Sequence, residues 1–134
     1  MLPLIGRFGV ITSRAHMIIW NRSKRVPHSL GFETKGGKFE PMIKKGWPLG
    51  VSVTATFTTA EPDQSSIMIK PFQGEKSLAA RNKELGVFDV TEIPPAAAGE
   101  PRIEVTFHVA DASGAFSITA RDARAGRDLP VLQR

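Results

Sequence analysis

Residues 63–75 have the sequence DQSSIMIKPFQGE, and the central part of this stretch, 65–70, predicts a short β-strand. Ile67 and Ile69 stand two residues apart among polar neighbours, which places them on the same face of a strand. Gly74 follows, where the strand has to turn. The stretch therefore predicts a strand with one apolar row, and its neighbours in the chain decide what kind of sheet it joins.

Two further stretches alternate strictly between apolar and polar residues. Val51, Val53, Ala55 and Phe57 share one strand face, and the apolar residues of 103–109 repeat the same pattern. Period-two alternation is typical of antiparallel sheets with one face turned to solvent, so we predict an all-β domain, a sandwich or a barrel. The predicted strands, separated by turns rich in Gly and Pro, are Leu30–Thr34, Phe39–Ile43, Val51–Thr59, Ile67–Pro71, Gly86–Val90, Ile103–Val109 and Ala115–Ala120, with a short one at Leu129–Leu132. The single helical candidate is Ser77–Leu85.

The positive charge of the chain is concentrated at its start. Residues 1–25 contain five basic side chains and no acidic one, whereas the basic and acidic side chains of the other 109 residues cancel. A nucleic-acid-binding domain more often carries its charge on one face of the folded body, so nucleic acid is an unlikely partner. The complete lack of cysteine agrees with a reducing compartment, and we expect a cytoplasmic protein.

The apolar runs of residues 1–25 are short and interrupted by Arg and Pro. None approaches the roughly 20 residues of a membrane-spanning helix, and a secretory signal would need one continuous apolar core. We therefore expect no membrane association. This segment is treated as a basic N-terminal extension, disordered or strand-pairing, that precedes a single domain at residues 26–134.

The sequence contains none of the common catalytic motifs. His16, His28 and His108 are scattered and lack carboxylates at metal-ligand spacing. The Gly-rich stretch 35–38 lacks the ending of a phosphate-binding loop and predicts a hairpin turn instead. Glu33 and Glu104 lie within strand patterns, where a solvated face is the simplest interpretation. We therefore expect neither an enzyme nor a bound metal or cofactor.

Five stretches, in order over about a hundred residues, resemble the substrate-binding β domain of the DnaK-type heat-shock chaperones. They are SLGFETKGG (29–37), FTTAEPDQSS (57–66), QGEKSLAARNKELGVFDV (73–90), IPPAAAGEPRIEVTF (93–107) and SITARDARAGRD (117–128). The resemblance implies a two-sheet antiparallel β-sandwich with a loop-roofed groove for extended hydrophobic segments of unfolded polypeptides. It also implies the residues of that groove: a pocket formed by Phe32, Phe57, Ile67, Ile69 and Ile103, and an arch formed by Lys35 and Ala60. Without the resemblance, the five apolar residues would be ordinary sandwich core.

The chain departs from the family pattern at several positions. Lys35 stands where bacterial members commonly have Met, so the arch is altered. Pro62 and Ala98 stand where other members carry the charged residues that hold a helical lid. A basic stretch, 20–25, replaces the apolar and acidic linker to the ATPase domain. We expect neither ATPase domain nor lid in this polypeptide, and therefore an ATP-independent, chaperone-like binding of peptides.

Residues 14–22 combine a short apolar core with basic flanks, the composition that these chaperones favour in peptides. The segment could thus occupy a groove, its own or a neighbour's, or pair along a strand edge and form a homo-oligomer. The alternative function is a structural or interaction protein, or a remnant, whose groove is unused or self-occupied. A third reading, a basic nucleic-acid binder, rests only on residues 1–25 and the two Trp.

Overall fold

The computed structural model describes residues 8–34, 36–110 and 115–134, with side chains described from Lys24 onward. These residues form twelve strands and one 3₁₀ turn, η1 (Ala79–Arg81). The strands are β1 (Phe8–Arg25), β2 (Leu30–Thr34), β3 (Lys38–Ile43), β4 (Pro48–Thr59), β5 (Ile67–Ile69), β6 (Pro71–Gln73), β7 (Lys83–Glu84), β8 (Phe88–Val90), β9 (Ile103–Val109), β10 (Phe116–Asp122), β11 (Arg127–Leu129) and β12 (Val131–Gln133).

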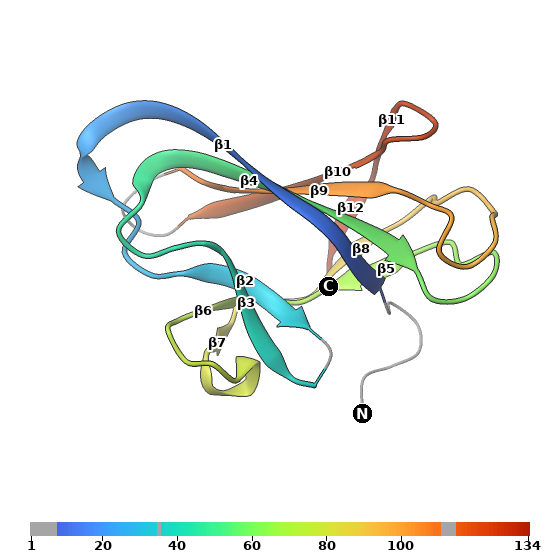
Figure 1. The fold of residues 1–134 in the computed structure, drawn as a ribbon, viewed down its shortest axis with the longest axis horizontal. Coiled ribbons are helices and arrows are strands. Elements are labelled where there is room, and N and C mark those ends of the chain that lie inside the picture. The colour runs from blue at the N-terminus through green and yellow to red at the C-terminus, as the bar shows by residue number, and fades with distance from the viewer. Residues whose placement is uncertain (1–7, 35, 111–114) are drawn as a thin grey trace.

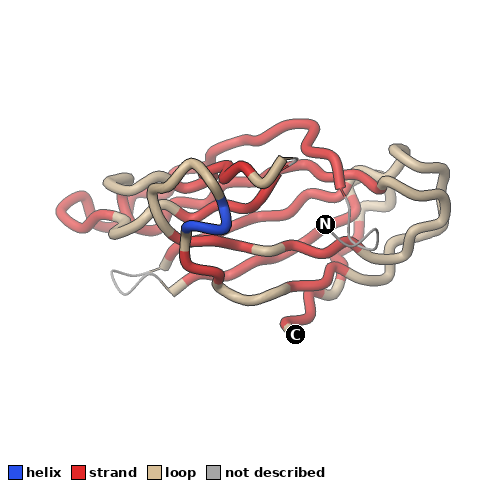
Figure 2. Tube along the Cα trace, turned by 90° about the horizontal axis from the view of Figure 1, so that it is seen from below, coloured by secondary structure: helices blue, strands red, loops and turns tan. Residues whose placement is uncertain are grey.

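All strand pairs are antiparallel, and they build three sheets arranged in two layers (Figure 1). One layer is a five-stranded sheet in the order β1-β4-β9-β10-β11. The other layer consists of a four-stranded sheet, β3-β2-β6-β7, and a three-stranded sheet, β12-β8-β5. The predicted antiparallel β-sandwich is therefore confirmed. Within the described residues, η1 is the one helical segment (Figure 2).

The core lies between the layers and follows the alternation of the sequence. In β4 and β9, every second side chain is buried and the ones between are half-exposed. Sheet-on-sheet packing needs this pattern, because successive side chains of a strand point to opposite faces. The second layer contributes its own buried apolar side chains, chiefly Leu30, Phe32, Ile67, Ile69 and Val90. β5 departs from strict alternation, since Met68 is buried as well.

The chain changes sheets at two prolines. β5 pairs with β8, whereas β6, which begins at Pro71, pairs with β2. Pro130 separates β11 from β12 in the same way, and these two strands belong to different layers. Proline has no backbone N–H to donate to a ladder, so a continuous strand is interrupted at each position. The predicted strands at 67–71 and 129–132 are each divided for this reason.

The expected helix at residues 77–85 is wrong. Only the single turn η1 forms, and it is followed by β7 at the edge of the four-stranded sheet. Asn82 holds this region, because its side chain accepts a hydrogen bond from Lys76 N at 2.9 Å and donates one to Lys76 O at 2.9 Å. A side chain that binds nearby backbone groups offers the chain an alternative to a helix.

Residues 8–25, which the sequence left hard to assign, form one long strand. β1 pairs with β4 from Phe8 opposite Thr59 to Arg25 opposite Pro48, with register shifts after Val10, Met17 and Asn21. Figure 1 shows β1 crossing the layer beside β4. The stretch 14–22, considered above as an occupant of the groove, thus lies along a strand edge.

Candidate peptide-binding site

The five apolar residues expected to line the pocket come together from four strands. Phe32 is on β2, Phe57 on β4, Ile67 and Ile69 on β5, and Ile103 on β9. All five belong to one hydrophobic cluster, and none has any solvent-exposed surface. The pairing of β4 with β9 brings two of these residues together, because Phe57 and Ile103 are opposite each other in the register.

Phe32 occupies the centre of this cluster. Its ring meets the ring of Phe57 edge to face, with centroids 5.2 Å apart, and stacks on that of Phe107 with centroids 5.9 Å apart. Aromatic pairs at these separations add about 0.5–1.5 kcal/mol to the burial of their apolar surface. The ring of Phe32 therefore fills the space where the two layers meet, and the pocket is closed to solvent in this conformation.

The loop at residues 60–66 joins two strands of the cluster and is held in shape by Gln64. The Gln64 Oε1 atom accepts hydrogen bonds from Ala60 N at 3.0 Å and Glu61 N at 3.2 Å, and Gln64 Nε2 donates to Ser66 O at 2.7 Å. Ala60, the predicted arch residue, is exposed at the beginning of this loop. Lys35, the other predicted arch residue, lies outside the described residues.

Two buried hydroxyl groups adjoin this loop. The Oγ1 atoms of Thr58 and Thr59, the last residues of β4, have no hydrogen-bond partner within the described structure. A buried hydroxyl without a partner costs free energy, so such groups often mark a place where a ligand or water supplies one. These two hydroxyls were not singled out by the sequence pattern, because their burial depends on the packing of β4.

A neighbouring loop, residues 93–102, is tied to the loop at 60–66. Asp63 N donates to Ala96 O at 2.8 Å, and Gly99 N donates to Thr59 O at 3.0 Å. Pro62 and Ala98, the two positions where we expected no lid latch, are both exposed on these loops. The two loops thus form one connected surface at this end of the sandwich.

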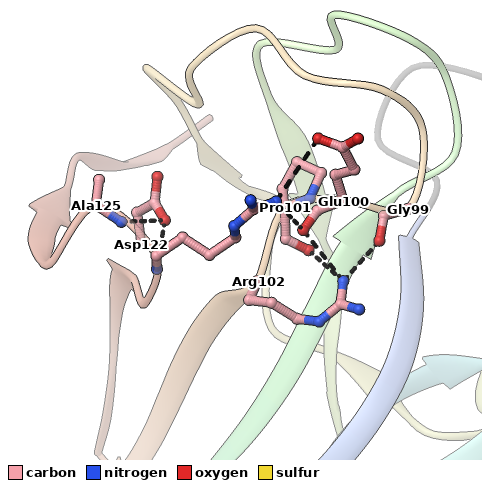
Figure 3. A network of polar contacts seen from close by, with 7 residues as sticks. Gly99, Glu100, Pro101, Arg102, Asp122 and Ala125 are labelled. Atoms are coloured by element: carbon pink, nitrogen blue, oxygen red, sulfur yellow. Dashed lines mark hydrogen bonds and ion pairs between the residues drawn. The ribbon is translucent and has the colours of Figure 1, made fainter.

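The side chain of Arg102, the last residue of the loop at 93–102, donates hydrogen bonds back to the backbone of that loop. Figure 3 shows its guanidinium turned toward three carbonyl oxygens, and Nη1 donates to Gly99 O at 2.6 Å, Glu100 O at 3.2 Å and Pro101 O at 3.0 Å. Arg124 reaches the same loop, with Nη1 3.6 Å from the Glu100 carboxylate. Asp122, only 5% exposed, accepts from Arg124 N at 3.0 Å and orients this turn.

A mainly polar depression of about 750 Å³ lies along the five-stranded sheet. Half-exposed residues of β4 and β9 form part of its lining, together with residues of β10 and β11. Its polar lining residues are Thr54, Thr56, Glu104, Thr106, Thr119, Arg121 and Asp128, and its apolar ones are Ile118, Ala120, Leu129 and Val131. Residues with hydroxyl or charged groups outnumber the apolar ones in this lining. Sequence reasoning assigned Glu104 to a solvated strand face and missed the hollow, because a hollow depends on sheet curvature.

No group of His, Asp and Glu is placed to hold a metal ion within residues 24–34, 36–110 and 115–134. In the described part of the chain, no helix has the length and apolar character needed to cross a membrane.

Comparisons with known proteins show the family of the chain. The Hsp70 protein family matches residues 24–131 of the chain. Chaperone protein DnaK from each of two strains of Halobacterium salinarum is 47% identical over 100 residues, which cover 75% of this chain. The matched part is 16% of the length of either relative, so the chain spans a small portion of the proteins it resembles. The match to the family covers most of the chain and establishes that the chain belongs to the Hsp70 family of chaperones.

Proposed function

We propose that this chain binds extended apolar segments of unfolded polypeptides at the cluster around Phe32 and Ile67, and that it does so without ATP. The single observation that carries the proposal is the convergence of five apolar side chains, from strands far apart in sequence, next to the loop at 60–66 in a domain of the Hsp70 family. The chain contains no cysteine, which agrees with a reducing compartment, and this supports a cytoplasmic location.

The recognition chemistry follows from what an unfolded segment offers. Its backbone has free N–H and C=O groups, and alternate side chains point to opposite sides. The hydroxyl of Thr59, which lies on the same strand face as Phe57, would find a partner on such a backbone, and one apolar side chain would enter the cluster. Burying a Leu there contributes about 1.5–3 kcal/mol, so we expect micromolar affinity at best.

Binding requires the cluster to open, since Phe32 and Ile67 have no exposed surface. The exposed loop at 60–66 is the natural element to move. It is held by the hydrogen bonds of one side chain, Gln64, and by its contacts with the loop at 93–102. No residue between Ala60 and Ser66 is buried, so no apolar side chain anchors this loop in the core, whereas the loop at 93–102 is anchored by the buried Ile93. Opening therefore breaks polar contacts that water can replace.

A titration with a fluorescent, Leu-rich peptide tests the proposal. Saturable binding at micromolar concentration, unchanged by ATP, is expected for the wild type. Ile67→Lys places a charge in the pocket and should weaken binding by about tenfold or more. Leu132→Lys, which changes a 57% exposed apolar residue, is the matched control and should bind normally. Because a buried Lys also threatens folding, circular dichroism accompanies the titration, and Ile67→Ala supplies a milder variant.

A second candidate function is a structural or interaction domain whose pocket stays closed. The complete burial of Phe32, Ile67 and Ile69 favours it. The same titration separates the two functions. If no peptide binds at high micromolar concentration, and neither pocket variant changes anything except stability, peptide binding at this cluster is refuted and the interaction role takes its place.

A further inference from the structure

The outer edge of β1 is the most unusual feature that the family match leaves unexplained. The match begins at residue 24, so β1 lies almost entirely before it. β1 is the last strand on its side of the five-stranded sheet, and within the described residues it pairs with β4 alone. The other edge of β1 therefore presents a row of backbone N–H and C=O groups that can pair with another strand.

One stretch of β1 is regular enough to pair with an added strand. The stretch from Thr12 to Met17 runs in unbroken register along β4, between two register shifts. It is as long as a typical strand. No proline occurs in residues 8–25, so each residue keeps its N–H. Thr12–Met17 is therefore the part of the edge that best accepts an added strand.

Charge indicates what kind of strand fits. β1 contains Arg14, Arg22, Lys24 and Arg25 and no acidic residue. The adjacent strand β4, residues 48–59, has no charged residue and so offers no carboxylate. In the part of the chain whose side chains are described, no ion pair involves Lys24 or Arg25, and both are exposed. The basic character of this edge is thus not neutralised by its neighbour.

We propose that the edge of β1 around Thr12–Met17 binds an acidic, extended segment of a partner protein by strand addition. A second copy of the chain is disfavoured, because pairing two β1 strands would set two acid-free basic segments side by side. A phosphate backbone also fits less well, since it accepts hydrogen bonds only, whereas a strand edge alternates donors and acceptors. An acidic peptide matches both the hydrogen-bonding pattern and the charge.

The test uses the full chain and two fluorescent peptides of about ten residues, one alternating Glu with Val and one alternating Lys with Val. Binding of the Glu peptide is expected, with weakening between about 0.05 and 0.5 M salt, because screening reduces the attraction of exposed charges. Hydrogen exchange should show new amide protection in residues 8–25 when the Glu peptide is present. This readout locates the site without any substitution.

A charge-reversed pair of variants adds a control. Arg14→Glu with Arg22→Glu should weaken the Glu peptide by about tenfold and improve the Lys peptide, because it reverses the electrostatic preference. Lys44→Glu with Lys76→Glu changes the net charge equally at two exposed positions outside β1, and should bind as the wild type does. The Leu-rich peptide should not compete with the Glu peptide, and Ile67→Ala should leave binding of the Glu peptide intact. The β1 site can therefore be tested independently of the pocket around Phe32 and Ile67.

Three results would overturn the inference. Equal affinity for the two peptides would remove the role of charge. Binding without new protection in residues 8–25 would place the peptide elsewhere. A dimer in analytical ultracentrifugation, with that same protection present before any peptide is added, would identify a second copy as the occupant.

Discussion

The Ser29 hydroxyl donates a 2.6 Å hydrogen bond to Glu75 Oε1, across 46 positions of sequence. The Ser29 N–H donates to the other carboxylate oxygen at 3.1 Å, and the same hydroxyl accepts a 3.0 Å hydrogen bond from Lys45 N. One nearly buried serine thus joins the segment before β2, the turn after β3 and the chain after β6. This contact therefore ties together chain segments that flank three strands of the four-stranded sheet.

We expect the contribution of Glu75 to stability to depend on pH. Burial raises the pKa of its carboxyl, but the hydrogen bonds from Ser29, together with the attraction of Lys45 and His28, outweigh burial and lower the pKa below the ordinary 4.5. The folded state thus binds the proton less readily than the unfolded state. The stabilisation is complete above about pH 4.5 and is lost as the pH falls through the lower, folded pKa.

Glu75→Gln should therefore cost about 1 kcal/mol at neutral pH, a small value because the side chain is 45% exposed and screened by water. The free energies of unfolding of this variant and the wild type should converge at acid pH, once the pH has fallen below the folded pKa of Glu75. Glu61→Gln, at an exposed position, is the control and should change stability little at any pH. A constant difference between the Glu75 variant and wild type over the whole range would contradict this account.

Gly31→Ala should prevent the four-stranded sheet from forming normally. A Cβ atom at this position would overlap the carbonyl oxygen of Glu40 on β3, and the backbone of Pro41 is also too close. The neighbour is backbone that cannot rotate away, so β2 and β3 must separate. We expect a loss of about 3 kcal/mol or more in chemical denaturation. A variant as stable as the wild type would show that the β2–β3 register differs from the one described.

Phe32→Val should open the cluster. Removing the ring leaves a cavity beside Phe57 and Phe107, and the free energy of unfolding should fall by about 2 kcal/mol. If the cluster is the peptide pocket, the same change should increase affinity for the Leu-rich peptide, because a Leu side chain can enter the space. Val53→Ala, another core change at β4, should cost stability without improving binding. Weaker binding by Phe32→Val would argue against Phe32 as the closing residue.

Asp122→Ala should loosen the turn between β10 and β11. The Asp122 Oδ1 atom accepts hydrogen bonds from the backbone N–H groups of Arg124 and Ala125, at 3.0 and 3.1 Å. Its removal leaves both donors without this acceptor, and we expect a loss of about 1–2 kcal/mol. Asp122→Asn keeps an oxygen at the same place and should lose less than half as much. Equal losses in the two variants would mean that the charge, rather than the acceptor, matters.

Local pattern predicted much of the fold because alternation is a local property. β2 and β9 have the bounds that the sequence predicted, and β4 begins only three residues earlier. The helix expected at 77–85 failed because Asn82 binds the backbone of Lys76, a contact that no periodicity reveals. The sequence alone did not reveal β1 as one strand, because its extended conformation depends on pairing with the edge of β4.

The sequence by itself determined the class of fold, because the spacing of apolar residues decides which strand face can be buried. It also determined the family, through stretches whose order and spacing are preserved over most of the chain. Only the tertiary structure decided that the pocket is closed, since that depends on Phe32 meeting Phe57 and Phe107, which lie on strands far from it in sequence. The same holds for β1, because an edge becomes available for pairing only after the strands beside it have assembled.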